Sequence, residues 1–163
     1  MRAALFAFSA VCLLTAGMAR AAEGDPNPNH PGEVALGRDG TTWVYKSFPA
    51  FLPLYTFEGD TDGASNCDAV CAAVWPIIRA PEHATPTGEW TIVQRADGRK
   101  QWAYKGKPVY TFYYDRPYEP HGDGRTAGWW LEENVDGTPL PGVKPKPKAK
   151  DAPPKPAWRL IVP

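Results

Sequence analysis

The feature that most constrains this chain is an internal duplication. The octapeptide PLYTFEGD at 53–60 returns as PVYTFYYD at 108–115, with Pro, Tyr, Thr, Phe and Asp at matching places. Upstream, DGTTWVYK at 39–46 can be laid over DGRKQWAYK at 97–105 with a one-residue gap. A repeat with a period of about 55 residues predicts two stacked copies of one supersecondary unit.

The residue pattern in each copy predicts antiparallel strands joined by tight turns. The run at 42–45 is rich in β-branched and aromatic residues and follows an Asp-Gly turn pair, and the run at 89–94 between the copies predicts another strand. We therefore expect a mainly β fold. Two repeated antiparallel hairpin units, over about 37–76 and 95–131, would form one small domain at 33–137 with one short helix that carries a cysteine pair.

The short helix is expected after the first copy of the octapeptide. Ser65 and Asn66 can cap a helix that begins near Cys67. Pro76 ends it, because the residue before a proline disfavours helical backbone. Cys67 and Cys71 then lie four residues apart on, or at the mouth of, one helical turn.

The first 21 residues predict a secretory signal peptide. Arg2 precedes an apolar run over 3–14, and small residues follow, with cleavage expected after Ala21. The apolar run is too short to span a bilayer, so we expect no transmembrane segment in the mature chain. Cys12 follows Val11, whereas a lipidated cysteine follows a small residue. We therefore expect a secreted or periplasmic protein that is not lipidated.

The charge of the mature chain argues against nucleic acid as a partner. Loss of Arg2 and Arg20 with the signal peptide leaves 16 basic and 18 acidic side chains, a net charge of −2. Five lysines cluster in the Lys/Pro-rich segment 138–157, so the body that precedes it is acidic. Binding to a phosphate backbone needs a cationic face, and we expect no nucleic-acid partner.

Three segments outside the repeats have their own patterns. Residues 22–32, AEGDPNPNHPG, predict a disordered lead-in. Nearly alternating prolines in the Lys/Pro-rich segment remove backbone donors and fix φ, which predicts an extended inserted loop or linker at 138–157. The chain ends in AWRLIVP, and we expect 158–163 to fold back as a closing strand because a loose end would expose these apolar side chains.

Cys67 and Cys71 are the two cysteines that remain after the signal peptide. In an oxidising compartment a pair this close most simply forms a disulfide, with Cys67 leaving the helix so that the Cβ atoms can approach. The alternative is a copper or redox site, because soft thiolates select Cu(I) and such sites usually add His or Met. The mature chain has no Met, and His83 or His121 could complete such a site. We expect no cofactor, with copper as the alternative.

Asp60 and Asp115 close the two copies of the octapeptide. Paired carboxylates could serve acid–base chemistry or glycoside cleavage. We favour a structural interpretation, in which each aspartate hydrogen-bonds the backbone of the turn after its strand, because this explains why it recurs in both copies. The sequence has no Ser-His-Asp order, phosphate-binding glycine loop or zinc signature, and we expect a protein that is not an enzyme.

Aromatic side chains are numerous and can serve two purposes in a small β domain. Cross-strand aromatic pairs build cores, and we expect Trp43, Trp102, Tyr55 and Tyr110 in the core because they recur in register. A second group flanks a loop and is the candidate for an exposed ligand face: Tyr113, Tyr114, Tyr118, Trp129 and Trp130.

At these residues the chain resembles a family of secreted bacterial repeat proteins and lipoproteins with a Yx(F/W/Y)xxD motif, whose function is not established. The two copies of the motif are Tyr55, Phe57 and Asp60, then Tyr110, Phe112 and Asp115. Companion runs are SNCxxxCxxxWP at 65–76 and RxDGRxQWAYKGxPVY at 95–110. The resemblance implies a secreted β-repeat module and leaves its activity open.

These observations favour a non-enzymatic secreted or periplasmic module that binds or scaffolds an unknown partner or polymer at the cell envelope. Two alternatives remain open. The first is a copper-handling or redox accessory protein that uses Cys67 and Cys71. The second is a carbohydrate-binding module that uses exposed tyrosines and tryptophans.

Overall fold

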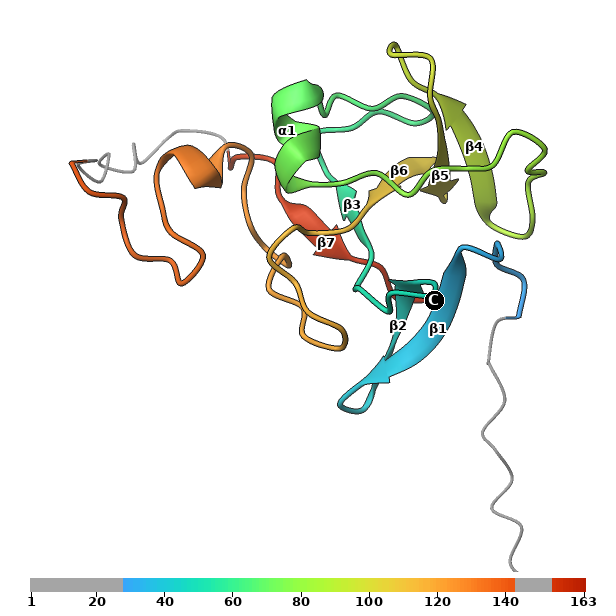
Figure 1. Cartoon of the computed structure of the whole chain (residues 1–163), viewed down its shortest axis with the longest axis horizontal. Helices are drawn as coiled ribbons and strands as arrows, with labels where there is room; N and C mark the ends of the chain where they lie inside the picture. The colour runs from blue at the N-terminus through green and yellow to red at the C-terminus, as the bar shows by residue number, and fades with distance from the viewer. Residues whose placement is uncertain (1–27, 143–153) are drawn as a thin grey trace, which may run out of the picture.

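The computed structural model describes residues 28–142 and 154–163. The predicted signal peptide at 1–21 lies outside these ranges, as do 22–27 of the predicted lead-in and 143–153 of the Lys/Pro-rich segment. The described protein is mainly β, with one short helix (Figure 1).

In the described part of the chain, seven strands form two sheets. The strands are β1 (Val34–Asp39), β2 (Thr42–Ser47), β3 (Tyr55–Phe57), β4 (Trp90–Gln94), β5 (Lys100–Tyr104), β6 (Lys107–Tyr110) and β7 (Trp158–Leu160). β1 and β2 form an antiparallel pair, and the other five form a second sheet in the order β4-β5-β6-β3-β7. Helix α1 (Ala69–Val74) follows β3, and a 3₁₀ turn, η1 (Trp129–Leu131), follows β6. The expected fold class is confirmed.

The two copies join along β3 and β6. These strands pair antiparallel with Tyr55 opposite Tyr110, so the two motif tyrosines are neighbours inside the five-stranded sheet (Figure 1). Each of these strands gains a second partner from a segment that follows the opposite copy in the chain. Ile77, after α1, bridges to Tyr110, and Leu160 of β7 pairs with Tyr55. Of the closing strand expected at 158–163, residues 158–160 form a strand, and it pairs with the strand of the first copy.

Two tryptophans stack on each other where the two halves of the domain meet in the core. The rings of Trp75 and Trp158 stack with centroids 3.7 Å apart and planes 6° apart. Tyr55 meets Trp75 edge-on at 5.5 Å, and Tyr110 meets Trp158 edge-on at 4.9 Å. Trp158 is therefore the structural counterpart of Trp75. Aromatic pairs of this kind contribute about 0.5–1.5 kcal/mol each beyond the burial of their area.

The register of β2 corrects one prediction about the core. The sequence overlay pairs Trp43 with Trp102 and predicts both in the core. In the first copy, Pro53 pairs with Lys46, the residue after Tyr45. In the second copy, the equivalent Pro108 pairs with Ala103, the residue after Trp102. Tyr45 therefore takes the place of Trp102, and both are buried. Trp43 stays partly exposed, with the Arg38 guanidinium 4.8 Å above its ring.

The core consists of two clusters of aromatic and aliphatic side chains. Tyr45, Trp90 and Tyr104 contact one another at centroid distances of 5.0–5.2 Å and join β2 to the β4–β5 hairpin. Trp75 and Trp158 centre the second cluster, against which one side of α1 packs. The clusters place β3 and β6 between them, which fixes the motif residues in the interior.

The described end of the predicted lead-in is packed against the domain. Pro31 is buried, the His30 ring meets Tyr45 edge-on at 6.2 Å, and the Val34 amide donates to the Pro31 carbonyl at 3.0 Å. Residues 28–32 therefore differ from the disorder that their composition predicts. A proline ring can be buried without leaving an unpaired backbone N–H, because it has none.

Candidate functional site

The motif tyrosines and aspartates bond across the two copies. The Tyr55 hydroxyl donates to Asp115 Oδ2 at 2.6 Å, and the Tyr110 hydroxyl donates to Asp60 Oδ2 at 2.7 Å. Each tyrosine lies on a strand of one copy, and each aspartate lies in the turn of the other. The motif therefore joins the copies at two equivalent places.

The other carboxylate oxygen of each aspartate holds its own turn. Asp60 Oδ1 accepts from the Asn66 amide and Asp115 Oδ1 from the His121 amide, both at 2.7 Å. The prediction that these aspartates bond the backbone of the following turn is confirmed. The bonds to the tyrosines of the opposite copy are additional, and the linear sequence does not show them.

Burial sets the protonation of these groups. Asp60 and Asp115 are only 3% and 8% exposed, and Tyr55 and Tyr110 are fully buried. Burial raises the pKa of both phenols well above the ordinary value, and the facing carboxylates act in the same direction. Burial also raises the pKa of both carboxyls, against the lowering effect of their phenol and amide donors. The phenols therefore remain donors at neutral pH.

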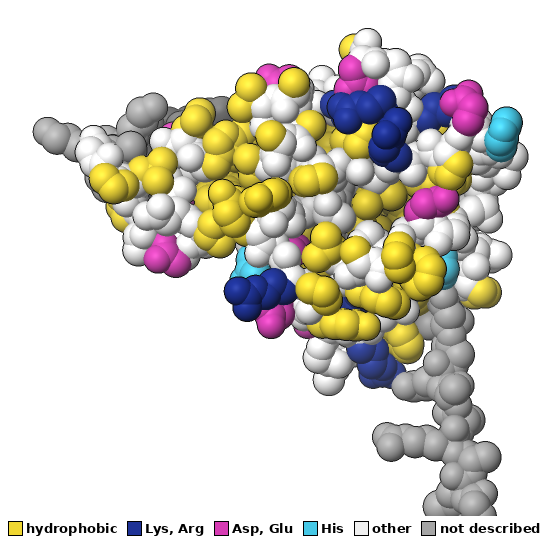
Figure 2. Space-filling view, in the orientation of Figure 1, with side chains coloured by type: hydrophobic (Ala, Val, Ile, Leu, Met, Phe, Trp, Pro, Cys, Tyr) yellow, Lys and Arg dark blue, Asp and Glu magenta, His cyan; other side chains and the backbone are white. Residues whose placement is uncertain are grey.

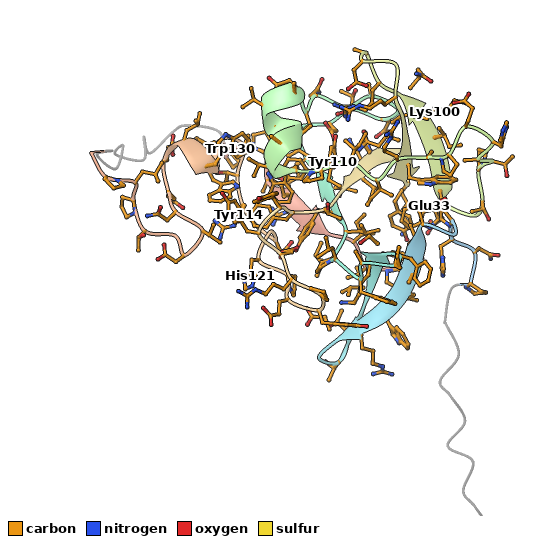
Figure 3. All side chains as sticks on the ribbon, in the orientation of Figure 1. Glu33, Lys100, Tyr110, Tyr114, His121 and Trp130 are labelled. Carbon is orange, nitrogen blue, oxygen red and sulfur yellow. A yellow bond between two sulfur atoms is a disulfide. The ribbon has the colours of Figure 1, made fainter. Side chains whose placement is uncertain are left out.

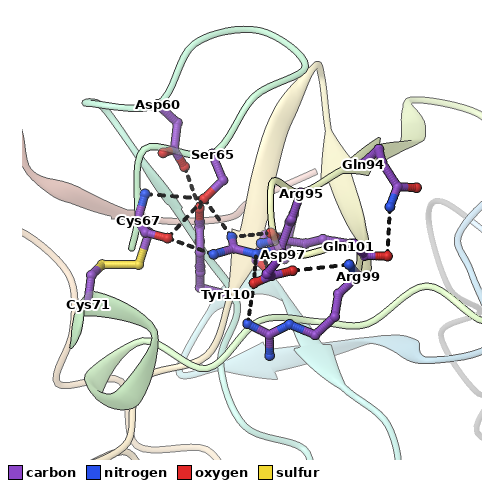
Figure 4. Close-up of polar contacts among 12 residues, drawn as sticks. Asp60, Ser65, Cys67, Cys71, Gln94, Arg95, Asp97, Arg99, Gln101 and Tyr110 are labelled. Carbon is purple, nitrogen blue, oxygen red and sulfur yellow. Dashed lines mark hydrogen bonds and ion pairs between the residues drawn. A yellow bond between two sulfur atoms is a disulfide. The ribbon is translucent and has the colours of Figure 1, made fainter. Parts of the chain in front are cut away.

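Arg95 links the second copy to the cysteine turn of the first (Figure 4). Its Nη1 donates to Ser65 Oγ at 2.6 Å and to Gln101 Oε1 at 2.9 Å, and its Nη2 donates to the Cys67 carbonyl at 2.6 Å. Ser65 Oγ in turn lies 2.7 Å from the Tyr110 hydroxyl. Sequence reasoning missed Arg95, since a single arginine before an Asp-Gly turn has no local signal that predicts burial.

Cys67 and Cys71 form the expected disulfide beside α1. Their sulfurs are 1.96 Å apart and their Cα atoms 5.2 Å apart. Cys67 lies outside the helix, as the disulfide interpretation requires, whereas the expected capping residues differ. Asp68 caps the helix by accepting from the Cys71 amide at 2.9 Å. Ser65 and Asn66 are occupied elsewhere, because they bond Tyr110 and the 59–60 turn.

The structure does not bring together the four residues considered for a copper site. Within the described ranges, no three His, Cys, Asp or Glu side chains gather closely enough to hold a metal ion. Cys67 and Cys71 are bonded to each other, and His121 Nε2 lies 3.8 Å from a Glu119 carboxylate oxygen. His83 lies in a loop before β4 and is exposed.

Four of the candidate face residues form what we call the aromatic belt: Tyr113, Tyr114, Trp129 and Trp130. Tyr113 meets Tyr114 edge-on at 5.1 Å, Tyr114 lies 6.2 Å from Trp129, and Trp129 lies 6.4 Å from Trp130. Tyr113 and Tyr114 are 67% and 45% exposed, and Trp130 is half-buried. In Figure 3, Trp130, Tyr114 and His121 follow one another along one side of the view.

Two residues of the predicted ligand face do not contribute an exposed ring to the belt. Trp129 is only 4% exposed, which corrects the expectation that it lies on the surface. It packs edge-on against Phe112 at 5.6 Å, and the Arg125 guanidinium covers it at 4.0 Å. Tyr118 is exposed but stacks on Phe51 at 5.9 Å, outside the belt.

A shallow polar hollow adjoins the belt. It has a volume of about 320 Å³, and its lining includes His121, Asp123, Arg125, Trp129 and Glu133. Arg125 is held in place because it donates to the His121 carbonyl at 2.8 Å and to the Val135 carbonyl. Trp129 belongs to both the belt and the hollow, so an aromatic surface and a set of charged groups meet at one place.

A family described as a secreted repeat of unknown function matches residues 49–79 and 91–131. Two segments of the chain are thus similar to this secreted repeat. The first match spans β3 and α1, and the second spans the strands β4, β5 and β6 and the turn η1. No curated protein and no solved structure matches the chain significantly.

The geometry shows what the two matched segments do within the fold. Each repeat contributes a strand with a tyrosine and a turn with an aspartate, and the two repeats exchange these groups. The β1–β2 pair and β7 lie outside the two matches and complete the structure around them. In the described residues, no helix has the length and apolar content needed to cross a bilayer.

Proposed function

We propose that this chain is a non-enzymatic binding module of the cell envelope and that its ligand face is the aromatic belt. The observation that carries the proposal is the exposure of Tyr113 and Tyr114, which touch each other and leave 67% and 45% of their surfaces in water. Contiguous exposed apolar surface marks interaction sites, and tyrosine is enriched at interfaces.

The non-enzymatic part of the proposal is supported by the state of the motif residues. Both oxygens of Asp60 and of Asp115 accept hydrogen bonds from inside the protein, and both side chains are almost fully buried. A carboxylate that serves as a general acid, base or nucleophile must reach its substrate. The paired aspartates are therefore used to hold the repeats together.

A glycan is the ligand class that the surroundings of the belt favour. Sugars present an apolar ring face and a rim of hydroxyls, and the belt lies next to a hollow with His121, Asp123 and Glu133. The tyrosine rings can contact the apolar face, while the charged groups can bond the hydroxyls. The similarity to a secreted repeat supports a polymer of the cell envelope as the source of the glycan.

A sedimentation assay with insoluble envelope polysaccharides, including peptidoglycan, tests this function. We expect the mature protein to sediment with at least one of these polymers and the Tyr113→Ala/Tyr114→Ala variant to lose about 90% of the bound fraction. Tyr118→Ala is the matched control, because it removes an equally exposed tyrosine outside the belt. Equal loss in the control, or full binding by the double variant, would contradict the assignment of the belt.

A further inference from the structure

A second hollow lies at the turn end of the β4–β5 hairpin. It has a volume of about 470 Å³ and is lined by two short segments of the chain, residues 79–82 and 97–100. We call it the basic hollow, because Arg79, Arg99 and Lys100 are part of its lining. Figure 2 shows Lys and Arg side chains gathered on the part of the molecule where Figure 3 labels Lys100. The basic hollow shares no lining residue with the hollow beside the belt.

The basic hollow differs in charge from the rest of the protein. Residues 28–142 carry 10 basic and 15 acidic side chains, a net charge of −5. The lining of the hollow has three basic side chains against the acidic Glu82 and Asp97, a net charge of +1. Positive charge is therefore concentrated at one place on an acidic protein. Such a place attracts small anions, whereas the surrounding surface repels long polyanions.

The backbone of the basic hollow is held in place by the sheet. Arg79 forms an antiparallel bridge with β5, and the Ala80 amide donates to the Lys100 carbonyl at 3.1 Å. The Arg95 amide donates to the Arg99 carbonyl at 2.9 Å and closes the turn of the hairpin. The cationic side chains therefore extend from a fixed backbone, which reduces the ordering that a ligand must impose.

Two carboxylates orient two of the three cations. Asp97 Oδ2 accepts from Arg99 Nη2 at 2.6 Å and from Arg95 Nε at 3.2 Å, and Asp97 Oδ1 accepts from the Arg99 amide at 3.0 Å. Lys100 Nζ donates to Glu82 Oε1 at 2.7 Å and to the Glu82 carbonyl at 3.0 Å. The bond from the Arg99 side chain lowers the pKa of Asp97, so this carboxylate stays charged. Arg99 and Lys100 both keep N–H donors that these bonds do not use.

Arg79 supplies the charge that has no counterpart in the hollow. It is exposed, and its guanidinium makes no hydrogen bond or ion pair with any described residue. The two carboxylates of the hollow are already engaged by Arg99 and Lys100. A planar guanidinium presents paired donors that fit the oxygens of a phosphate or a carboxylate. Three cations around one hollow suit a phosphate better, because it has more oxygens to share among them.

We propose that the basic hollow binds one phosphate group, either free or carried as a monoester on an envelope glycan. Arg79 binds the phosphate with its paired N–H donors, and Arg99 and Lys100 bind it with the donors that their carboxylate partners leave free. The acidic surface around the hollow disfavours nucleic acids and other long polyanions, because it repels them along their length. The site is independent of the belt, so failure of one proposal leaves the other unaffected.

Titration with inorganic phosphate and with glucose-1-phosphate, at constant ionic strength, tests the proposal. The NMR signals of the arginine Nε–H groups of the mature protein are the readout. We expect the Arg79 and Arg99 signals to shift until the site is saturated, and Arg79→Gln to weaken the affinity about tenfold. Arg79→Lys should lose less, because it keeps the charge and loses only the paired donors. Arg116→Gln is the matched control, since it removes another exposed arginine, outside the hollow, and should leave the affinity unchanged.

The two ligands distinguish the two sources of the phosphate. Tighter binding of glucose-1-phosphate would identify a carried monoester, and tighter binding of inorganic phosphate would identify the free ion.

The proposal is overturned by the absence of saturable shifts at Arg79 and Arg99. It is also overturned by an equal loss of affinity in Arg116→Gln, which would show a general effect of net charge. Acetate that binds as tightly as phosphate would assign the hollow to carboxylates instead. Thermal unfolding of each variant checks that the fold is intact.

Discussion

Tyr55 and Tyr110 lie opposite each other on β3 and β6, and each donates its phenol hydrogen to the aspartate of the other copy. The same pair also contacts the two stacked tryptophans, Tyr55 against Trp75 and Tyr110 against Trp158. The two copies are therefore not independent units that only the chain connects. Each completes the strand, the hydrogen bonds and the aromatic stack of the other, so we expect them to unfold as one unit.

Tyr55→Phe and Tyr110→Phe should each destabilise the whole protein. Loss of the hydroxyl leaves a buried carboxylate oxygen without its donor, which lowers the free energy of unfolding by about 1–3 kcal/mol. Urea denaturation measures this, and Tyr113→Phe is the control because its ring is mostly exposed. Combining Tyr55→Phe with Asp115→Asn should give less than the sum of the single effects, and strict additivity would argue against a direct bond.

Arg95→Met should be among the most destabilising single substitutions of a charged residue, because Arg95 is buried. It removes three short donor bonds to Ser65, Gln101 and the Cys67 carbonyl, and we expect a loss of about 2–4 kcal/mol in the free energy of unfolding. Arg99→Met is the matched control, because Arg99 pairs with an exposed Asp97 and should leave stability close to wild type. Similar stabilities for the two variants would contradict the role of Arg95.

Cys67 and Cys71 should be fully oxidised to the disulfide in the purified protein. Loss of the disulfide should destabilise the protein only modestly. Thiol titration of the unreduced mature protein should find no free thiols, and Cys67→Ser/Cys71→Ser should lower the free energy of unfolding by at most about 2 kcal/mol, because the closed loop is short. Metal analysis belongs in the same experiment. Two titratable thiols that take up Cu(I) in a fixed ratio would instead support the copper alternative.

Asp115 should make a pH-dependent contribution to stability. Burial raises its folded pKa above 3.8, so the folded state holds the proton more tightly than the unfolded chain does. Its stabilising contribution is therefore complete below 3.8 and is lost as pH rises through the folded pKa. The stability difference between wild type and Asp115→Asn should shrink as pH rises from about 4 to about 7. A difference that grows over this range would show that the Tyr55 and His121 donors outweigh burial.

Local patterns were sufficient for much of this fold. The alternation around Tyr55 and Tyr110, the Asp-Gly turns and the apolar end at 158–163 each predict their element from neighbours in the chain, and the structure contains these elements. The disulfide could also be predicted, because two cysteines four residues apart in an exported chain have few other partners.

The same local patterns placed some side chains wrongly. Trp43 and Trp102 match in the alignment, yet the prolines before the motif set a register that puts Tyr45 in the core instead of Trp43. Trp129 is buried beneath Arg125, although its neighbours on the loop are exposed. Spacing along one strand does not specify which residue of a distant segment it will face.

The sequence by itself determined that this is a duplicated, disulfide-bonded β-repeat chain, because duplication, turn chemistry and cysteine spacing are local properties. Only the tertiary structure decided which copy each tyrosine, aspartate and tryptophan serves, and that Arg95 and Lys46 are buried. Those outcomes depend on contacts between residues that are far apart in the chain, such as Arg95 with Ser65 and Trp75 with Trp158. Contacts of that range are chosen by how the sheets pack, which no window of the sequence contains.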